Sequence, residues 1–261
     1  MAEATAAAGE RTLRRDQLVL VALLCALTLV CWAWSLGMAA QMEAGAAQGH
    51  HHYQHAQHAQ HAEGWADVFA MWAVMMAGMM VPPELRLWTR LLRLRSERAA
   101  GPAPLVAMGL FIGGYLGSWT AYSLAAALLQ RRFQAVGLLD AGLALNHRAL
   151  AGAVLLVAGA AQFSPLKRAC LQRCRAPAAA LDAEGEGPLA AASAGLRHGA
   201  ISIGSCGALM LVLFVTGVMS PLWMTLVTAL LVVEAAAPAA WRASAVAGGL
   251  LLAWGGWLLL V

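Results

Sequence analysis

The amino-acid sequence predicts an all-α fold, a polytopic membrane bundle of about seven transmembrane helices. Composition is the first observation: 61% of the 261 residues are hydrophobic and 11% are charged, whereas soluble domains carry about 25% charged residues. Long apolar runs are the second, because a helix needs about 20 such residues to cross a bilayer. These runs are too long for the strands of a membrane barrel, which alternate over about 10 residues. The expected spans are 17–40, 65–83, 105–129, 150–163, 198–220, 222–240 and 243–261.

The distribution of basic residues is the third observation, and it indicates the orientation. If the N-terminus is cytoplasmic, all 17 lysines and arginines except Arg131, Arg132 and Arg148 fall on the cytoplasmic side. This matches the positive-inside bias of membrane proteins. We therefore expect a multi-pass protein of a bacterial inner membrane, in contact with the lipid bilayer. The net charge of +4 then follows from topology, and no nucleic acid is expected as a partner.

The chain divides into a tail, an anchor and a multi-span region. The expected segments are a cytoplasmic tail (1–16), a first span (17–40), a His-rich external loop (41–64) and a membrane domain (65–261) with cytoplasmic loops 84–104 and 164–197. The first span can also be read as a signal peptide, but its apolar core exceeds the usual run of about 7–15 residues and favours an uncleaved anchor.

Three local expectations concern the ends of helices. Loop 84–104 is expected to form a short amphipathic interfacial helix that is separate from the second span. Ser164-Pro165 has the pattern of a helix start, with serine as N-cap and proline at the first helical position, and that helix should run to about Ala176. The short fourth span is expected to begin near Gly142.

The external loop is of low complexity and contains six of the eight histidines. Neutral imidazole binds copper, zinc and nickel, and four of these histidines recur every third residue, which would bring two or three of them to one ion. The alternative is a drifting low-complexity tract without a role. The histidines expected to contact metal are His51, His52, His55, His58 and His61.

One face of the second span is rich in methionine, at Met71, Met75, Met76, Met79 and Met80. Thioethers are soft ligands that suit Cu(I). The opposite face carries small residues, which would let another helix approach closely. Methionine is also an adaptable filler of apolar cores, so both a ligand role and a packing role are open.

Sulfur and carboxylate groups on a helix of the second cytoplasmic loop and within the fifth and sixth spans are further candidate ligands. Cys170 and Cys174 are four residues apart on one helix face, as are Cys206 and Met210. Glu234 lies within an apolar run, where a carboxylate is costly and indicates function. The alternatives are cysteines that face the bilayer edge and a glutamate whose hydrogen bond fixes helix packing. Two other residues are expected at the inner interface, Glu84 without a special role and His198 facing water.

Three motifs in order resemble a bacterial family of predicted metal-binding integral membrane proteins, a domain of unknown function. They are MWAVMMAGMMVPP, QFSPLKRACLQRCRAP and GAISIGSCGALMLVLFVTGVMSPLWMTLVTALLVVEAAAP. The resemblance covers about residues 65–240 and implies metal binding. The chain departs from the family at Ser205-Cys206, where the family has two cysteines, and at Ala235, where it has a lysine.

These patterns together favour a membrane protein that binds a soft transition metal, copper above all, for transport, storage or delivery. An enzyme is not expected, because the chain has no GxSxG, Walker-type or HExxH motif. A metalloenzyme or another membrane protein is the expected partner. One alternative is a non-catalytic subunit or assembly factor of a larger membrane complex. Another is an organic-solute permease.

Overall fold

The computed structural model describes residues 2–47, 64–98, 104–140, 142–176, 187–237 and 240–260. Its helices are α1 (Ala2–Ala47), α3 (Trp65–Arg98), α4 (Pro104–Ala135), α5 (Arg148–Phe163), α6 (Pro165–Cys174), α8 (Pro188–Met210), α9 (Val212–Thr216), α10 (Pro221–Ala236) and α11 (Ala240–Leu260). The described residues contain no strand beyond one isolated β-bridge, Leu139 to Leu145. The predicted all-α class is therefore confirmed.

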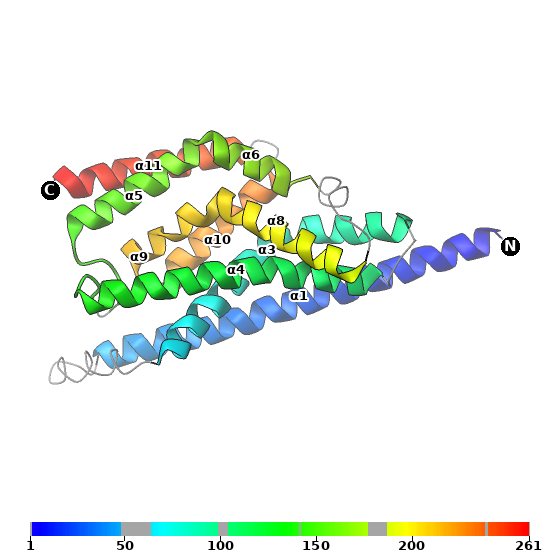
Figure 1. Ribbon diagram of the computed structural model, residues 1–261, viewed down its shortest axis with the longest axis horizontal. Helices are drawn as coiled ribbons and strands as arrows, with labels where there is room; N and C mark the ends of the chain where they lie inside the picture. Colours follow the sequence, from blue (N-terminus) through cyan, green and yellow to red (C-terminus); the bar gives the residue numbers. More distant parts are fainter. Residues whose placement is uncertain are drawn as a thin grey trace.

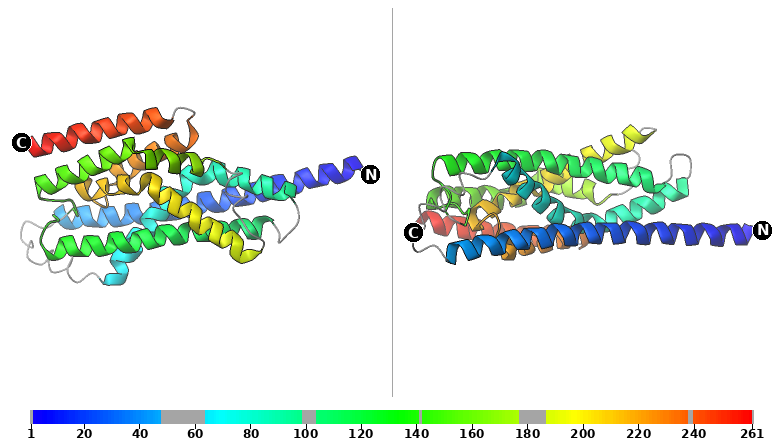
Figure 2. Two further views of the ribbon diagram at one scale, coloured as in Figure 1. Left: turned by 45° about the horizontal axis from the view of Figure 1, so that its top comes forward. Right: turned by 90° about the horizontal axis from the view of Figure 1, so that it is seen from below.

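The helices run up and down along one long axis, with the N-terminus at one end and the C-terminus at the other (Figure 1). The most extensive pairs are α4 with α8, α5 with α11, and α1 with α3, while α10 contacts both α3 and α11. The α5–α11 pair and α1 lie on opposite sides of the bundle, with α8 and α10 between them (Figures 1 and 2). This arrangement brings α3, α6 and α8 together around the site described below.

Five helical stretches of the described chain are long and apolar enough to cross a membrane. They are Leu13–Gln41, Trp65–Glu97, Pro104–Ala135, Pro188–Thr216 and Ala240–Leu260. A sixth is reached if α5 and α6, which meet at a bend of 62°, are counted as one span, and α10 is a shorter apolar helix. The sequence predicts about seven spans, so the length criterion alone reaches five or six of them.

α3 does not end at Pro83 as predicted but continues to Arg98. Proline lacks the N–H that would bond the carbonyl four residues earlier, so Pro82 leaves the carbonyl of Gly78 without its helical donor. The indole Nε1 of Trp32, on α1, donates to this carbonyl at 3.2 Å. A donor from a neighbouring helix thus replaces one of the two bonds that the prolines remove.

The apolar face of the α3 extension is buried in protein, and the extension is continuous with α3 and is not the separate interfacial helix that the sequence predicts. Leu87, Trp88, Leu91 and Leu92 are at most 7% exposed. The ring of Trp88 packs edge-on against Tyr115 of α4, with ring centroids 5.2 Å apart. The apolar face that suggested a bilayer surface is therefore a helix–helix contact.

The starts of three other helices can be compared with the predictions. α6 begins at Pro165 with Ser164 as N-cap, as predicted, and ends at Cys174. α5 begins at Arg148, later than expected, because residues before it form a turn in which Asp140 accepts hydrogen bonds from two backbone N–H groups. α8 begins at Pro188, ten residues before the expected span.

α4 and α8 pack with their backbones in near contact. A Cβ atom on Gly195 would lie 1.9 Å from the carbonyl oxygen of Phe111, and one on Gly114 would lie 2.0 Å from that of Ala192. Only glycine permits so close an approach. The hydroxyl of Ser118 also donates to the carbonyl of Leu196 at 2.7 Å. The rotation of α8 is thus fixed against α4.

We predict that Gly114→Ala destabilises the protein, because the new methyl group would overlap backbone atoms of α8. Overpacking of this kind costs about 1–3 kcal/mol, and each kcal/mol lowers Tm by roughly 2–4 °C in a chain of this size. Thermal unfolding of the detergent-solubilised protein measures the effect. Gly113→Ala is the matched control, since a Cβ there meets nothing within 4 Å. Equal Tm values for the two variants would contradict this packing.

Candidate metal centre

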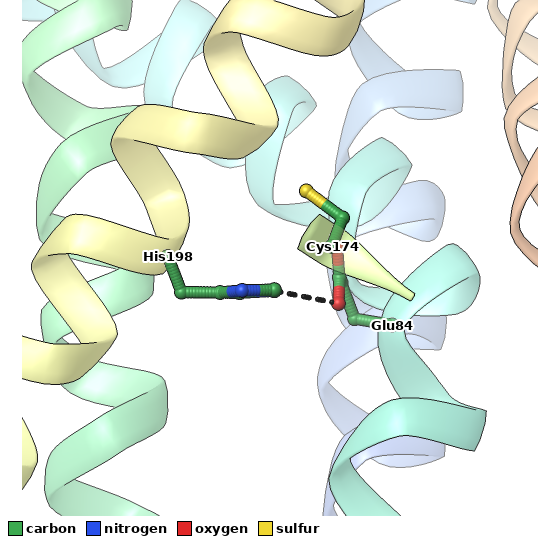
Figure 3. A group of neighbouring side chains, drawn as sticks. All are labelled: Glu84, Cys174 and His198. Carbon is green, nitrogen blue, oxygen red and sulfur yellow. Dashed lines mark hydrogen bonds and ion pairs between the residues drawn. The ribbon is translucent and has the colours of Figure 1, made fainter. Parts of the chain in front are cut away.

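Three ligand-bearing side chains from three helices meet inside the bundle (Figure 3). They are Glu84 of α3, Cys174 at the end of α6 and His198 of α8, and one donor atom of each lies within 4.8 Å of the others. Nε2 of His198 is 3.0 Å from a carboxylate oxygen of Glu84. All three residues are buried, at 5–8% exposure.

Each of these side chains is positioned by its own helix. Glu84 follows Met80 by one turn on the part of α3 that continues beyond the prolines. The imidazole of His198 packs beside the rings of Phe111 and Tyr115, with both centroid distances 5.6 Å. Close packing of α8 on α4 therefore determines where this imidazole points.

α6 brings Cys174 to the same place. Its first turn is capped by Ser164, whose hydroxyl accepts from the N–H of Lys167 at 3.1 Å. Cys174 is seven residues after Lys167, two turns along the same face. Anchoring Lys167 therefore also determines the direction of the Cys174 thiol.

A cavity of about 350 Å³ opens beside these residues. Its polar and sulfur-bearing lining consists of Met80, Glu84, Arg86, Arg90, Tyr115, Cys174, Arg175, Ser202, Ser205, Cys206 and Glu234. Four of the predicted metal ligands, Met80, Cys174, Cys206 and Glu234, thus face one cavity although they come from four different helices.

The donor set suits a borderline or soft transition metal. Thiolate and imidazole are ligands of copper and zinc, and thioether sulfur favours Cu(I). Metal–ligand bonds of about 2.0–2.3 Å place two donors of one ion at most about 4.6 Å apart. The donor atoms of Glu84, Cys174 and His198 are already within 4.8 Å of one another. Small side-chain adjustments therefore suffice for all three to contact one ion.

Glu234 is engaged by other residues. Lys167 Nζ donates to its two carboxylate oxygens at 2.8 and 2.9 Å, and the hydroxyl of Ser244 donates to one of them at 2.6 Å. Lys167 also donates to Gln162. Lys167 and Glu234 are 3% and 2% exposed, so this is a buried ion pair that joins α5, α6, α10 and α11. A direct role of Glu234 as a copper ligand stays a prediction.

The methionine face of α3 is buried, as both of its interpretations require. Met71, Met75, Met76, Met79 and Met80 are at most 2% exposed. Met80 lines the cavity, and the other four methionines pack in the apolar core. Met210 is also buried, one turn after Cys206. The expected small face opposite is in place at Gly78, where α1 approaches closely.

Cys170 and Cys174 both turn toward α8, as their spacing predicts. Sγ of Cys170 lies over Gly204 of α8, 2.9 Å from where a Cβ would stand. The two thiols are separated along α8, since Cys174 lies near His198 and Cys170 lies near Gly204. The predicted ligands His51, His52, His55, His58 and His61 lie outside the described residues.

The sequence interpretation overlooked Glu84 and His198. His198 does not face water but is 5% exposed, because α8 begins ten residues earlier than predicted and the imidazole contacts Glu84 of α3 and the rings of Phe111 and Tyr115 of α4. A signal for both was present in the spacing. Glu84 continues the one-turn series Met76–Met80, and His198 precedes Ser202 and Cys206 by one and two turns.

Comparison with models of protein families yields a match over most of the chain. The model of a protein family described as PpoB2, copper chaperone, matches residues 69–258. Neither the curated proteins nor the solved structures gave a match. The matched residues include the three helices that supply Glu84, Cys174 and His198.

We predict that Lys167→Met destabilises the protein by about 3–5 kcal/mol, because it leaves the Glu234 carboxylate buried without a partner. Adding Glu234→Gln should restore most of the loss, since removing both charges leaves neither one uncompensated. Chemical unfolding of the detergent-solubilised variants measures both effects. Arg93→Met is the control, because the Arg93–Glu97 pair is exposed and such pairs contribute less than about 1 kcal/mol. A double variant no more stable than Lys167→Met would refute the pairing.

Proposed function

Since the chain belongs to the PpoB2 copper chaperone family, we propose that it binds copper inside its helix bundle and delivers it to a copper-requiring metalloenzyme. The observation that carries this proposal is the meeting of Glu84, Cys174 and His198 in a buried cluster. Copper is the cargo of such a protein and not its resident cofactor. We propose no catalytic reaction for the chain.

The geometry of the cluster favours transient binding. Structural metal sites are usually closed by four protein ligands, whereas open sites have three and leave a position for an exogenous one. Here three donors lie beside a cavity of about 350 Å³. An incoming ligand from a partner would reach the ion from that cavity. Sulfur atoms of Met80 and Cys206 in the same wall would favour Cu(I) over harder ions.

We also propose that the chain spans a bacterial inner membrane about seven times, with its N-terminus in the cytoplasm. The surface supports this, because large apolar side chains such as Leu18, Leu29, Leu250 and Trp257 are 65–71% exposed. Apolar patches of this kind fit a lipid environment. α5 and α10 have 16 residues each, which is about 24 Å of helix against a hydrocarbon core of about 30 Å. They would be the two short spans.

The orientation puts the cluster in the cytoplasmic half. The end of α3, α6 and the start of α8 lie toward the end of the bundle that holds the N-terminus (Figure 1). Arginines are concentrated there, including Arg86, Arg90 and Arg175 beside the cavity. By the positive-inside bias this end is cytoplasmic. Copper bound at the cluster would thus be exchanged on the cytoplasmic side.

We expect the wild-type protein to retain copper after anaerobic Cu(I) loading and washing, and Cys174→Ser and His198→Ala to lose most of it. Each change removes one donor from a three-donor cluster. Metal content by mass spectrometry is the readout. Cys25→Ser is the control, because this cysteine is exposed on α1. Copper should also raise the Tm of the wild type, because a ligand at a free concentration of 100 times its Kd adds about 2.7 kcal/mol to the free energy of unfolding.

Three further variants separate this site from the alternative ones. A deletion of residues 50–61 should leave the retained copper unchanged if the bundle site holds it. Met80→Leu should weaken retention, whereas Met76→Leu, equally buried one turn away, should not. A wild type that retains no copper, zinc or nickel would refute metal handling, and full retention by Cys174→Ser and His198→Ala would refute this site.

A further inference from the structure

The mouth of the cavity is lined by three arginines. Arg86 and Arg90 are exposed on α3, and Arg175 follows α6. The guanidinium group of Arg175 donates to the carbonyl of Ala237, which holds it at the rim. No carboxylate among the described residues forms an ion pair with Arg86 or Arg90. Their charges therefore face the entrance without compensation from that part of the chain.

Two carboxylates lie deeper in the cavity. Glu234 is paired with the Lys167 ammonium, and Glu84 is hydrogen-bonded to His198. The three guanidinium charges outnumber the one carboxylate charge that has no cationic lysine or arginine partner, so the entrance has a net positive field. A bare copper cation would be repelled at this entrance, while an anion would be attracted, and such fields change association rates by about 10- to 1000-fold.

The cavity is also larger than an ion requires. Copper bound to protein donors at about 2.0–2.3 Å occupies only the space between those donors. A cavity of about 350 Å³ instead falls in the range of about 300–1,000 Å³ that is typical of small-molecule sites. Its volume and its charge both indicate a small anionic ligand.

We infer that this cavity accepts Cu(I) as an anionic complex with a small thiol that bears carboxylate groups. The inference rests on the proposed copper function and names the form of the cargo. The arginines bind the carboxylates of the carrier, as guanidinium groups do with high geometric specificity. The carrier sulfur then lies toward Cys174 and Cys206, the two thiols of the cavity wall.

Transfer is a ligand exchange at copper without a change of oxidation state. The sulfur of Cys174 forms a bond to Cu(I) as the bond between copper and the carrier sulfur breaks. The proton of the Cys174 thiol passes to the departing carrier thiolate, so the carrier leaves as a free thiol. Glu84 and the neutral imidazole of His198, which keeps its single proton on the ring nitrogen that does not bind copper, complete the coordination once the carrier has left. The reverse sequence releases copper to a carrier of the same class.

The test compares the rate of copper loading from two sources, the copper(I)–glutathione complex, which is anionic, and acetonitrile-solvated Cu(I), which is a cation. In the double variant Arg86→Gln/Arg90→Gln, loading from the glutathione complex should slow by at least about tenfold. Loading from solvated Cu(I) should not slow. Arg93→Gln is the control, because this exposed arginine of α3 is paired with Glu97 and lies outside the cavity wall.

Salt dependence gives a second test on the wild type alone. Raising the ionic strength screens the entrance, so loading from the glutathione complex should slow and loading from solvated Cu(I) should not. Unchanged rates in the double variant and at high salt would overturn the inference while leaving the copper function intact. Equal slowing from both sources would also overturn it. A wild type that takes copper from neither source would refute the copper function itself.

Discussion

The buried ion pair between Lys167 and Glu234 sets the arrangement of the inner half of the bundle. Two opposite charges that are buried away from water must form an ion pair, because either charge alone would strongly destabilise the fold. Lys167 and Glu234 bond to each other, Lys167 also donates to Gln162, and Ser244 donates to Glu234. These bonds join α5, α6, α10 and α11 at one point. α6, which meets α5 at a bend of 62°, cannot rotate about its axis without breaking this network. Cys174, two turns further along α6, is therefore held toward α8.

The same network shapes the chemistry of the cavity. Lys167 neutralises Glu234, and His198 is hydrogen-bonded to Glu84, so both interior carboxylates have a partner from another helix. The proposed copper ligands are the sulfur atoms in the cavity wall together with Glu84 and His198, and three arginines line the same cavity. Close packing of α8 on α4 through Gly114 and Gly195 fixes the remaining side of this cluster. The packing of the helices thus determines the geometry of the candidate ligands.

Hydropathy and spacing predict much of the fold and part of the site. Apolar runs predict most of the helices, and the Ser164-Pro165 pattern predicts the start of α6. The spacing of four residues predicts that Cys170 and Cys174 share one helix face. The continuation of α3 was not predictable, because it depends on a donor from Trp32, on a different helix. Glu234 was singled out as a costly buried charge, but its partner Lys167 is 67 residues away in sequence.

Glu84 and His198 were missed because their positions relative to the helix ends were wrong. Once α3 extends beyond its prolines and α8 begins at Pro188, both residues move from the expected interface into the bundle. The one-turn spacing from Met80 to Glu84, and from His198 through Ser202 to Cys206, then puts all of them on faces that meet. Tertiary contacts, which no local pattern encodes, decide the boundaries.

The most direct test of the central claim is X-ray absorption spectroscopy of the Cu(I)-loaded protein. We predict a mixed shell of sulfur and imidazole nitrogen that persists when residues 50–61 are deleted, and an imidazole signal that falls together with the retained copper in His198→Ala. A shell of sulfur alone in the wild type would contradict it. So would an imidazole signal that disappears with the deletion and is unchanged in His198→Ala.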